Sequence, residues 1–281
     1  MSDNPIDLDA LRREIDQIDD RLHDLLIQRA ETVQRLASVK RSGPAMRPER
    51  EASILRRLVG RHRGPLPAGV VGRIWREIIA SLTRFQSPHS VALYAAYGTI
   101  EHFDVARAHF GAARIDLHDT PVQALRAVAE SAGQVIAVMP LPGSEEQAWW
   151  PLLASTDSQR PRIVARLPFL RDGTSPVEAV VVAPFGPGLS GDDASYLIIV
   201  TGYGTEISRG RLNDRLVAAG IHGQCLDSRP RGGDTLHLFE VDGLLDDQDP
   251  RLQALIAAHG DEIAQAIPVG GYARPLDLAA R

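Results

Sequence analysis

The fold is decided by residues 8–40, which read LDALRREIDQIDDRLHDLLIQRAETVQRLASVK. Apolar residues recur in this stretch at alternating spacings of three and four, the pattern of a helix that packs along another helix. They are Leu8, Leu11, Ile15, Ile18, Leu22 and Leu25, and the pattern resumes at Leu36 and Val39. We therefore predict one long amphipathic helix, capped by Asp7 or Asp9 and stopped by Ser-Gly-Pro at residues 42–44.

Arg29 interrupts this apolar seam, and Lys40 projects from nearly the same face three turns later. A buried cation is costly unless an anion meets it, so the two side chains could hold one anionic ligand across about 16 Å of helix. The alternative is that their stems pack while their charged ends reach water. Arg12 points about 100° away from Arg29 and should serve a different neighbour.

Two shorter helices are predicted next, one starting at Pro48 and one after Pro67. Arg50 and Glu51 share the inward side of the first of them, and the apolar stripe of the second continues to Gln86. Because the long helix cannot be covered by two shorter ones, we expect an obligate dimer in which the long helices pair. The apolar residues expected to face inward are Ile54, Leu55, Leu58, Val71, Ile74, Trp75, Ile78 and Leu82.

Several cations, one carboxylate and one neutral amide are thus expected inside the helical region. This set offers no pair of nucleophile and base and no metal-ligand spacing, so we expect no metal and no cofactor. Fixed donors of this kind hold a small dianion and stabilise charge that develops during a reaction. The residues alone predict a polycarboxylate site made of Arg29, Lys40, Arg50, Glu51 and Gln86, with Arg12 reaching into the other protomer's site.

The composition is that of a globular protein, with 44% hydrophobic and 24% charged residues over 281 positions. A net charge of -5 argues against nucleic acid or an acidic membrane as the main partner. Cys225 is the single cysteine, and the acidic N-terminus lacks an apolar signal core. We expect a soluble, cytoplasmic protein.

The stretch quoted above, followed by RPERE and IWREIIASLTRFQ, resembles the all-helical chorismate mutases. The likeness covers about the first third of the chain and recurs in order at matching spacing. It implies the rearrangement of chorismate to prephenate in an intertwined dimer. Such a rearrangement needs the substrate held compact and its ether oxygen stabilised, which fits a site without a nucleophile.

The matching positions imply a role for each candidate residue. Arg29 and the partner's Arg12 would bind carboxylates, Lys40 and Gln86 would donate to the ether oxygen, and Glu51 would accept from the ring hydroxyl. Two further residues would line the site: Arg50, and Arg47, which stands where some members have an acidic residue.

Residues 89–195 read as alternating strands and helices and resemble the catalytic domain of prephenate dehydratases. The family's catalytic motifs do not carry over. Pro-Leu-Pro-Gly-Ser at 140–144 replaces a proline followed by Glu-Asn-Ser, and Ala-Ser-Tyr at 194–196 replaces Thr-Arg-Phe. We therefore expect a single truncated lobe without dehydratase chemistry.

Residues 196–281 follow a β-α-β-β-α-β pattern and resemble the ACT domain that closes the bifunctional P-proteins. The resemblance implies an aromatic amino acid effector at Asp227, Ser228, Arg229 and Pro230. Arg211 replaces a small residue of the family's other motif. A dimerisation module without a ligand is therefore the alternative.

The sequence thus predicts a multi-domain chain: an all-α three-helix mutase domain (1–88), an α/β lobe (89–195) and an α+β, ferredoxin-like ACT domain (196–281). We expect chorismate mutase activity. Three alternatives stay open: a bifunctional mutase and dehydratase, an isochorismate pyruvate-lyase, which uses the same helical fold, and a non-catalytic effector-binding or partner-activating protein.

Overall fold

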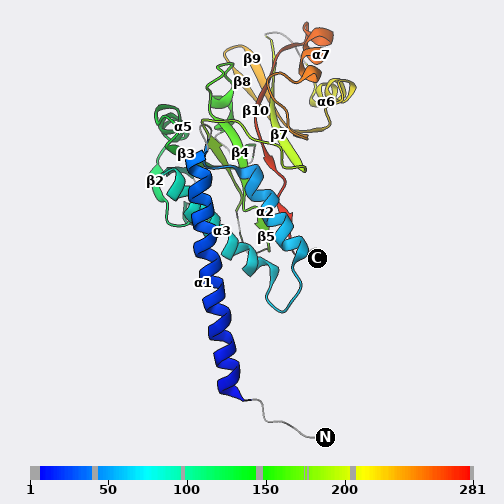
Figure 1. Ribbon diagram of the computed structural model, residues 1–281. Helices are drawn as coiled ribbons and strands as arrows, with labels where there is room; N and C mark the ends of the chain where they lie inside the picture. The colour runs from blue at the N-terminus through cyan, green and yellow to red at the C-terminus, as the bar shows by residue number, and fades with distance from the viewer. Residues whose placement is uncertain are drawn as a thin grey trace, which may run out of the picture. The chain divides into compact units, whose positions relative to one another are not determined.

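The computed structural model describes residues 7–39, 44–95, 99–143, 148–173, 175, 177–202 and 207–278. The chain forms two compact units, Met1–Gly43 and Pro44–Arg281. In the first unit, the predicted long helix is α1, Leu8–Val39 (Figure 1). Asp7 caps this helix, because its Oδ1 accepts a hydrogen bond from the backbone N–H of Asp9 at 3.0 Å. No residue of α1 is buried, and its apolar seam lies exposed.

The second unit begins with two helices that pack against each other, and the second of them also packs against a third. The predicted inward position of Leu55 is confirmed. The predicted stripe on α3 is partly wrong: Ile74 is 45% exposed, whereas Ile79 and Ala80 are buried. Since α3 has two neighbours, its buried face is set by both, and an apolar face that includes Phe85 remains exposed. The three helices are α2 Pro48–Arg61, α3 Ala68–Gln86 and α4 Thr99–Phe110.

Within the described residues, one nine-stranded sheet runs through the second unit in the order β2-β1-β3-β6-β4-β10-β7-β9-β8. Strands β2, β1 and β3 are parallel, β10 meets β4 in parallel, and the other neighbours are antiparallel. The strands are β1 Ser90–Tyr94, β2 Arg114–His118, β3 Val135–Pro140, β4 Arg162–Leu167, β6 Ala179–Ala183, β7 Asp193–Thr201, β8 Gly223–Arg231, β9 Asp234–Asp242 and β10 Ile263–Ala273. Two short strands, β5 Leu170–Arg171 and β11 Leu276–Asp277, pair separately.

The N-terminal part of the sheet is covered on both faces. Val105 and Ala106 of α4 pack on one face, and Ala124 and Val128 of α5 (Pro121–Glu130) pack on the other. Buried tryptophans at the start of a short 3-10 helix, η1 (Trp150–Leu153), extend the core on the α5 side. Covered faces explain why these strands read as continuous apolar runs.

The C-terminal part has the predicted β-α-β-β-α-β order, with α6 (Arg209–Ala218) after β7 and α7 (Pro250–His259) after β9. Both helices lie on one face of β7 and β9, as Figure 1 shows. Leu212 and Leu255 close a core there with Leu197. The predicted fold class, N-terminal helices followed by an α/β region, is confirmed.

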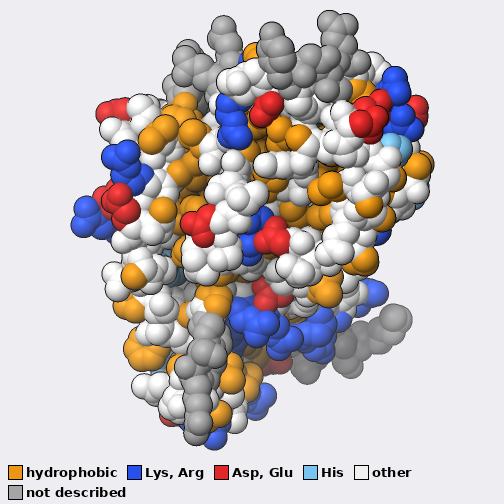
Figure 2. All heavy atoms as spheres, turned by 90° about the horizontal axis from the view of Figure 1, so that it is seen from above, with side chains coloured by type: hydrophobic (Ala, Val, Ile, Leu, Met, Phe, Trp, Pro, Cys, Tyr) orange, Lys and Arg blue, Asp and Glu red, His pale blue; other side chains and the backbone are white. Residues whose placement is uncertain are grey.

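The domain boundaries at residues 88 and 195 stay predictions. In the structure, residues 44–281 form one compact unit, and β7 already starts at Asp193. None of the described helices combines the length and the apolar character needed to cross a membrane. Acidic and basic side chains are interspersed with apolar ones on the face seen in Figure 2.

A buried hydroxyl in β7 gives a stability prediction. Ser195 Oγ donates to the carbonyl of Gly243 at 2.9 Å and accepts from the backbone N–H of Leu245 at 2.8 Å. Ser195→Ala should lower the free energy of unfolding by about 1–3 kcal/mol, because the buried N–H of Leu245 loses its partner and the carbonyl of Gly243 loses a donor. Denaturant melts measure this loss, and Ser158→Ala, at an exposed serine, is the control. Equal stability of the two variants would contradict the prediction.

Candidate functional site

The candidate residues of α1 differ in burial. Arg12 is exposed, and its Nη1 donates to Asp9 at 3.1 Å, a surface contact of little energy. Arg29 is partly buried, and no described residue partners its buried Nη1. Burial lowers the pKa of Arg29 from its ordinary value. Lys40 lies outside the described residues. Arg29 is thus the cation of α1 best prepared to meet an anion.

On α2, the structure separates residues that the sequence placed on one side. Arg50 is exposed, and so is Arg47, whose Nε donates to Glu49 at 2.7 Å. Glu51 is only 6% exposed, and its Oε2 accepts from Arg76 Nη1 at 2.6 Å. Arg50 and Glu51 are therefore not brought together: one faces outward, and the other faces the interior.

Gln86 ends α3 and is half-buried, with its Nε2 donating to the carbonyl of Leu82 at 3.3 Å. This contact within one helical turn is long, so the amide can exchange it for a ligand at small cost. Among the described residues, no group of three or more His, Cys, Asp or Glu side chains is arranged to hold a metal ion.

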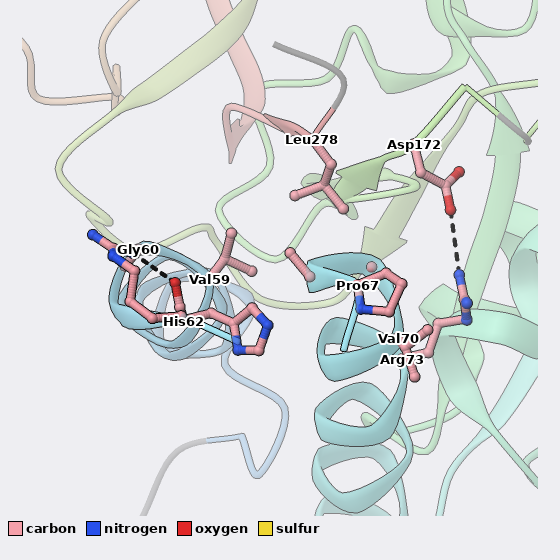
Figure 3. A pocket seen from close by; sticks show the side chains of 11 residues that line it. Val59, Gly60, His62, Pro67, Val70, Arg73, Asp172 and Leu278 are labelled. Carbon is pink, nitrogen blue, oxygen red and sulfur yellow. Dashed lines mark hydrogen bonds and ion pairs between the residues drawn. The ribbon is translucent and has the colours of Figure 1, made fainter. Parts of the chain in front are cut away.

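Two of the cavities lined by described residues lie beside α3. The larger, of about 670 Å³, lies between the end of α2 and the start of α3, with His62 between the helices and Leu278 opposite (Figure 3). Arg73 Nη1 donates to Asp172 at 3.3 Å on its wall. The smaller, of about 310 Å³, lies between α3 and α4 and includes His109. Neither cavity is lined by a residue that the sequence assigned to a site.

The C-terminal motif lies on β8. Asp227 Oδ2 accepts from Trp150 Nε1 at 3.1 Å and from Arg229 Nε at 2.8 Å. Burial raises the pKa of Asp227, but hydrogen bonds from Arg229 and Trp150 outweigh it, and the pKa lies below its ordinary value. Pro230 pairs with Thr235 at the end of the hairpin. The carboxylate is thus already occupied by protein donors.

The sequence interpretation missed a buried histidine beside this motif. His237 Nδ1 lies 2.9 Å from Ser228 Oγ, which also accepts from Arg209 Nε at 3.0 Å, and His237 Nε2 lies 3.3 Å from Thr201 Oγ1. Burial, followed by the charge of Arg209, lowers the pKa of His237. Its place within the apolar run of β9 was the available signal, because a histidine there must find hydrogen-bond partners.

Residues 194–196, where a dehydratase motif was sought, lie inside β7 and are fully buried. The hydroxyl of Ser195 is saturated by the backbone, as described above. Of the other stretch, Pro140 ends β3 and its carbonyl accepts from Trp149 Nε1, whereas Ser144 lies outside the described residues. Neither described stretch presents a free reactive group.

The N-terminal part of the chain is similar to a known protein family. Residues 11–87 match the family described as chorismate mutase type II. The chain is 37% identical over 151 residues to a bifunctional chorismate mutase/prephenate dehydratase of Pseudomonas aeruginosa, covering 50% of this chain and 40% of that protein. The protein of the same description from Neisseria gonorrhoeae is 35% identical over 100 residues, covering 36% and 27%.

Solved structures give a weaker likeness. Prephenate dehydratase from Streptococcus mutans superposes with a TM-score of 0.47 at 17% identity, over 67% of this chain and all of that one. The enzyme of Arthrobacter aurescens in complex with L-Phe gives 0.45 at 16% identity, over 66% and 92%. At these scores the likeness supports no inference about this chain.

The chain covers at most 40% of the length of the curated relatives named above, so the activity of those whole proteins is not a finding about it. The family match and the order of the parts agree. The chain therefore contains a chorismate mutase type II domain at residues 11–87, followed by an α/β region.

Proposed function

We propose that this chain is a chorismate mutase, which rearranges chorismate to prephenate. The observation that carries the proposal is the match of residues 11–87, which contain every cation that the sequence assigned to the site. The substrate is a small dianion, and its rearrangement needs fixed positive donors rather than a nucleophile.

Arg29 is the central carboxylate ligand in this proposal. Its partly buried guanidinium has a free Nη1, and a bound carboxylate would supply the missing acceptor. Lys40 and the amide of Gln86 would donate to the ether oxygen as its bond breaks. Arg50, exposed on α2, and Arg47 beside it supply further positive charge. No step moves a proton to or from the protein.

The mutase would act as a dimer. The seam of α1 is exposed along its whole length, and an apolar face of α3 with Ile74 and Phe85 is exposed as well. Contiguous exposed apolar faces mark interaction surfaces. A second copy of the chain would cover them, and the partner's Arg12 would then complete each pocket.

The C-terminal part would bind an aromatic amino acid at residues 227–230 and modulate the mutase. The retained Asp-Ser-Arg-Pro segment supports this proposal, because it offers polar side chains that are partly buried. Dehydratase activity would be absent, since Ser195 is buried and its hydroxyl is bonded to the backbone.

A product assay tests the proposal. Purified chain supplied with chorismate should deplete it and form prephenate without phenylpyruvate at neutral pH. Phenylpyruvate above the uncatalysed background would establish the bifunctional alternative, and pyruvate released in a parallel assay supplied with isochorismate would indicate the lyase. No turnover of chorismate would overturn the proposal and favour a non-catalytic role.

Complementation tests the crossed site. Arg29→Ala should lose about 100- to 1,000-fold in kcat, the effect of removing one preorganised charge donor, and Arg12→Ala should be similarly impaired. Arg21→Ala, on the same helix, is the control. Mixing the two impaired variants gathers both lesions in one pocket of a heterodimer and leaves the other intact. About half of the wild-type activity should return per heterodimer. No recovery in verified heterodimers would place Arg12 in the site of its own chain.

A further inference from the structure

A buried ion pair between α2 and α3 lies beside His109 of α4, whose Nε2 has no hydrogen-bond partner among the described residues. Glu51 Oε2 accepts from Arg76 Nη1 at 2.6 Å, and the two side chains are 8% and 11% exposed. His109 of α4 places its Nε2 4.0 Å from the same carboxylate oxygen and is equally buried. The sequence interpretation missed Arg76 and His109, because the spacing of apolar residues does not show which polar side chains of a helix are buried.

The rotation of α2 fixes which of its side chains can reach this cluster. The buried face of α2 holds Pro48, Glu51, Ala52, Leu55 and Val59. Leu55 and Ala52 pack on Phe169 and Ala273 of the α/β region. Arg50, one residue before Glu51, lies about 100° around the helix and is exposed. The carboxylate thus faces the α/β region while the neighbouring guanidinium faces away from it.

The carboxylate has no easy way to leave this position. Moving it outward would leave Arg76 as a buried cation without a counter-charge, and burying an unpaired charge is strongly unfavourable. A second anchor holds the helix in the same rotation: Arg56 donates to the carbonyls of Asp192 and Arg274 at 2.8 and 3.0 Å. The first anchor pairs α2 with α3 and places its carboxylate beside His109 of α4, and the second ties α2 directly to the α/β region.

We infer that Glu51, Arg76 and His109 form a docking cluster by which the α/β region positions the mutase helices, so that Glu51 is a positioning residue and not the acceptor of the substrate's ring hydroxyl. The inference deepens the proposed function and rests on it. It extends the functional unit of the mutase beyond residue 87, to His109 on α4. The cluster acts by fixing the direction in which Arg50 points.

Protonation of His109 gives a first readout. Burial, then the charges of Arg76 and His89, holds the pKa of His109 well below its ordinary value. Glu51 and, across a small shared cavity, Arg166 also face it, and the cavity between α3 and α4 adds Arg73, Glu101 and Asp104. Because the folded-state pKa is depressed, the stabilisation by neutral His109 is complete above about pH 6.5 and is lost as the pH falls further.

The melting temperature of the full chain should therefore fall between pH 7.5 and 5.5, and His109→Gln should flatten that fall. His222→Gln, at an exposed histidine, is the control. His237 is present in every variant, so its contribution cancels in the comparison. An unchanged pH slope in His109→Gln would remove His109 from the cluster.

A double-mutant cycle tests the role of Glu51. Glu51→Gln and Arg76→Gln should each lower the melting temperature and reduce kcat/KM by about 10- to 100-fold, the effect of misplacing binding groups. The double variant should recover much of both losses, since two amides can pair and no charge stays buried alone. Glu130→Gln, at an exposed glutamate of α5, is the control.

Kinetics are measured well below the melting temperature of every variant, so that unfolding does not enter the rates. If Glu51→Gln lowers kcat/KM at an unchanged melting temperature and the double variant shows no recovery, Glu51 contacts substrate and the inference is overturned. If the wild-type chain does not turn over chorismate, the proposed function fails separately. The melting temperatures then still decide whether the cluster docks the helices.

Discussion

The second unit depends on the close approach of β10 to β4. At Gly270 the backbone of β10 meets that of Ile163, and a Cβ at this glycine would come within 2.1 Å of the Ile163 carbonyl oxygen. The residue also has a φ of 123°, which favours glycine. This contact joins the α/β lobe and the ferredoxin-like part into one sheet. A side chain here would separate the two halves, so a single backbone position unites what the sequence predicts as two domains.

The sheet in turn carries the helical hairpin. Strand β10 continues past Gly270 to Ala273, which packs on Ala52 and Leu55 of α2, and Arg56 bonds to the carbonyl of Arg274. The same strand pairs with β7 along its length. Strand β10 thus touches the lobe, the ferredoxin-like part and α2, and a displacement in any of the three must be accommodated by the other two.

Much of this fold follows from the sequence, because local patterns determine it. Buried strands appear as apolar runs, such as AVVVA in β6, and Pro48 marks the start of α2. What the sequence could not supply is the choice of neighbour. The apolar residues of α3 could form either of two buried faces, and the positions of α2 and α4 together bury Ile79 and leave Ile74 exposed. The neighbours of Glu51 likewise lie on α3 and α4, far away in the sequence. Its position next to Arg50 in the sequence suggested that both residues line one site, but Glu51 is buried and Arg50 is exposed.

The hairpin therefore serves two interfaces, one on each side. On the side that packs on the α/β region lie Leu55 and the Glu51–Arg76 pair. Arg50 and the apolar face with Phe85 are exposed. An ion pair on the first side adds directional specificity that apolar contacts lack, although its net stabilisation is small after desolvation. Fixed on that side, the hairpin presents the other side in one orientation. A helix partner and an anionic ligand can then meet a preformed surface, which reduces the ordering cost of binding.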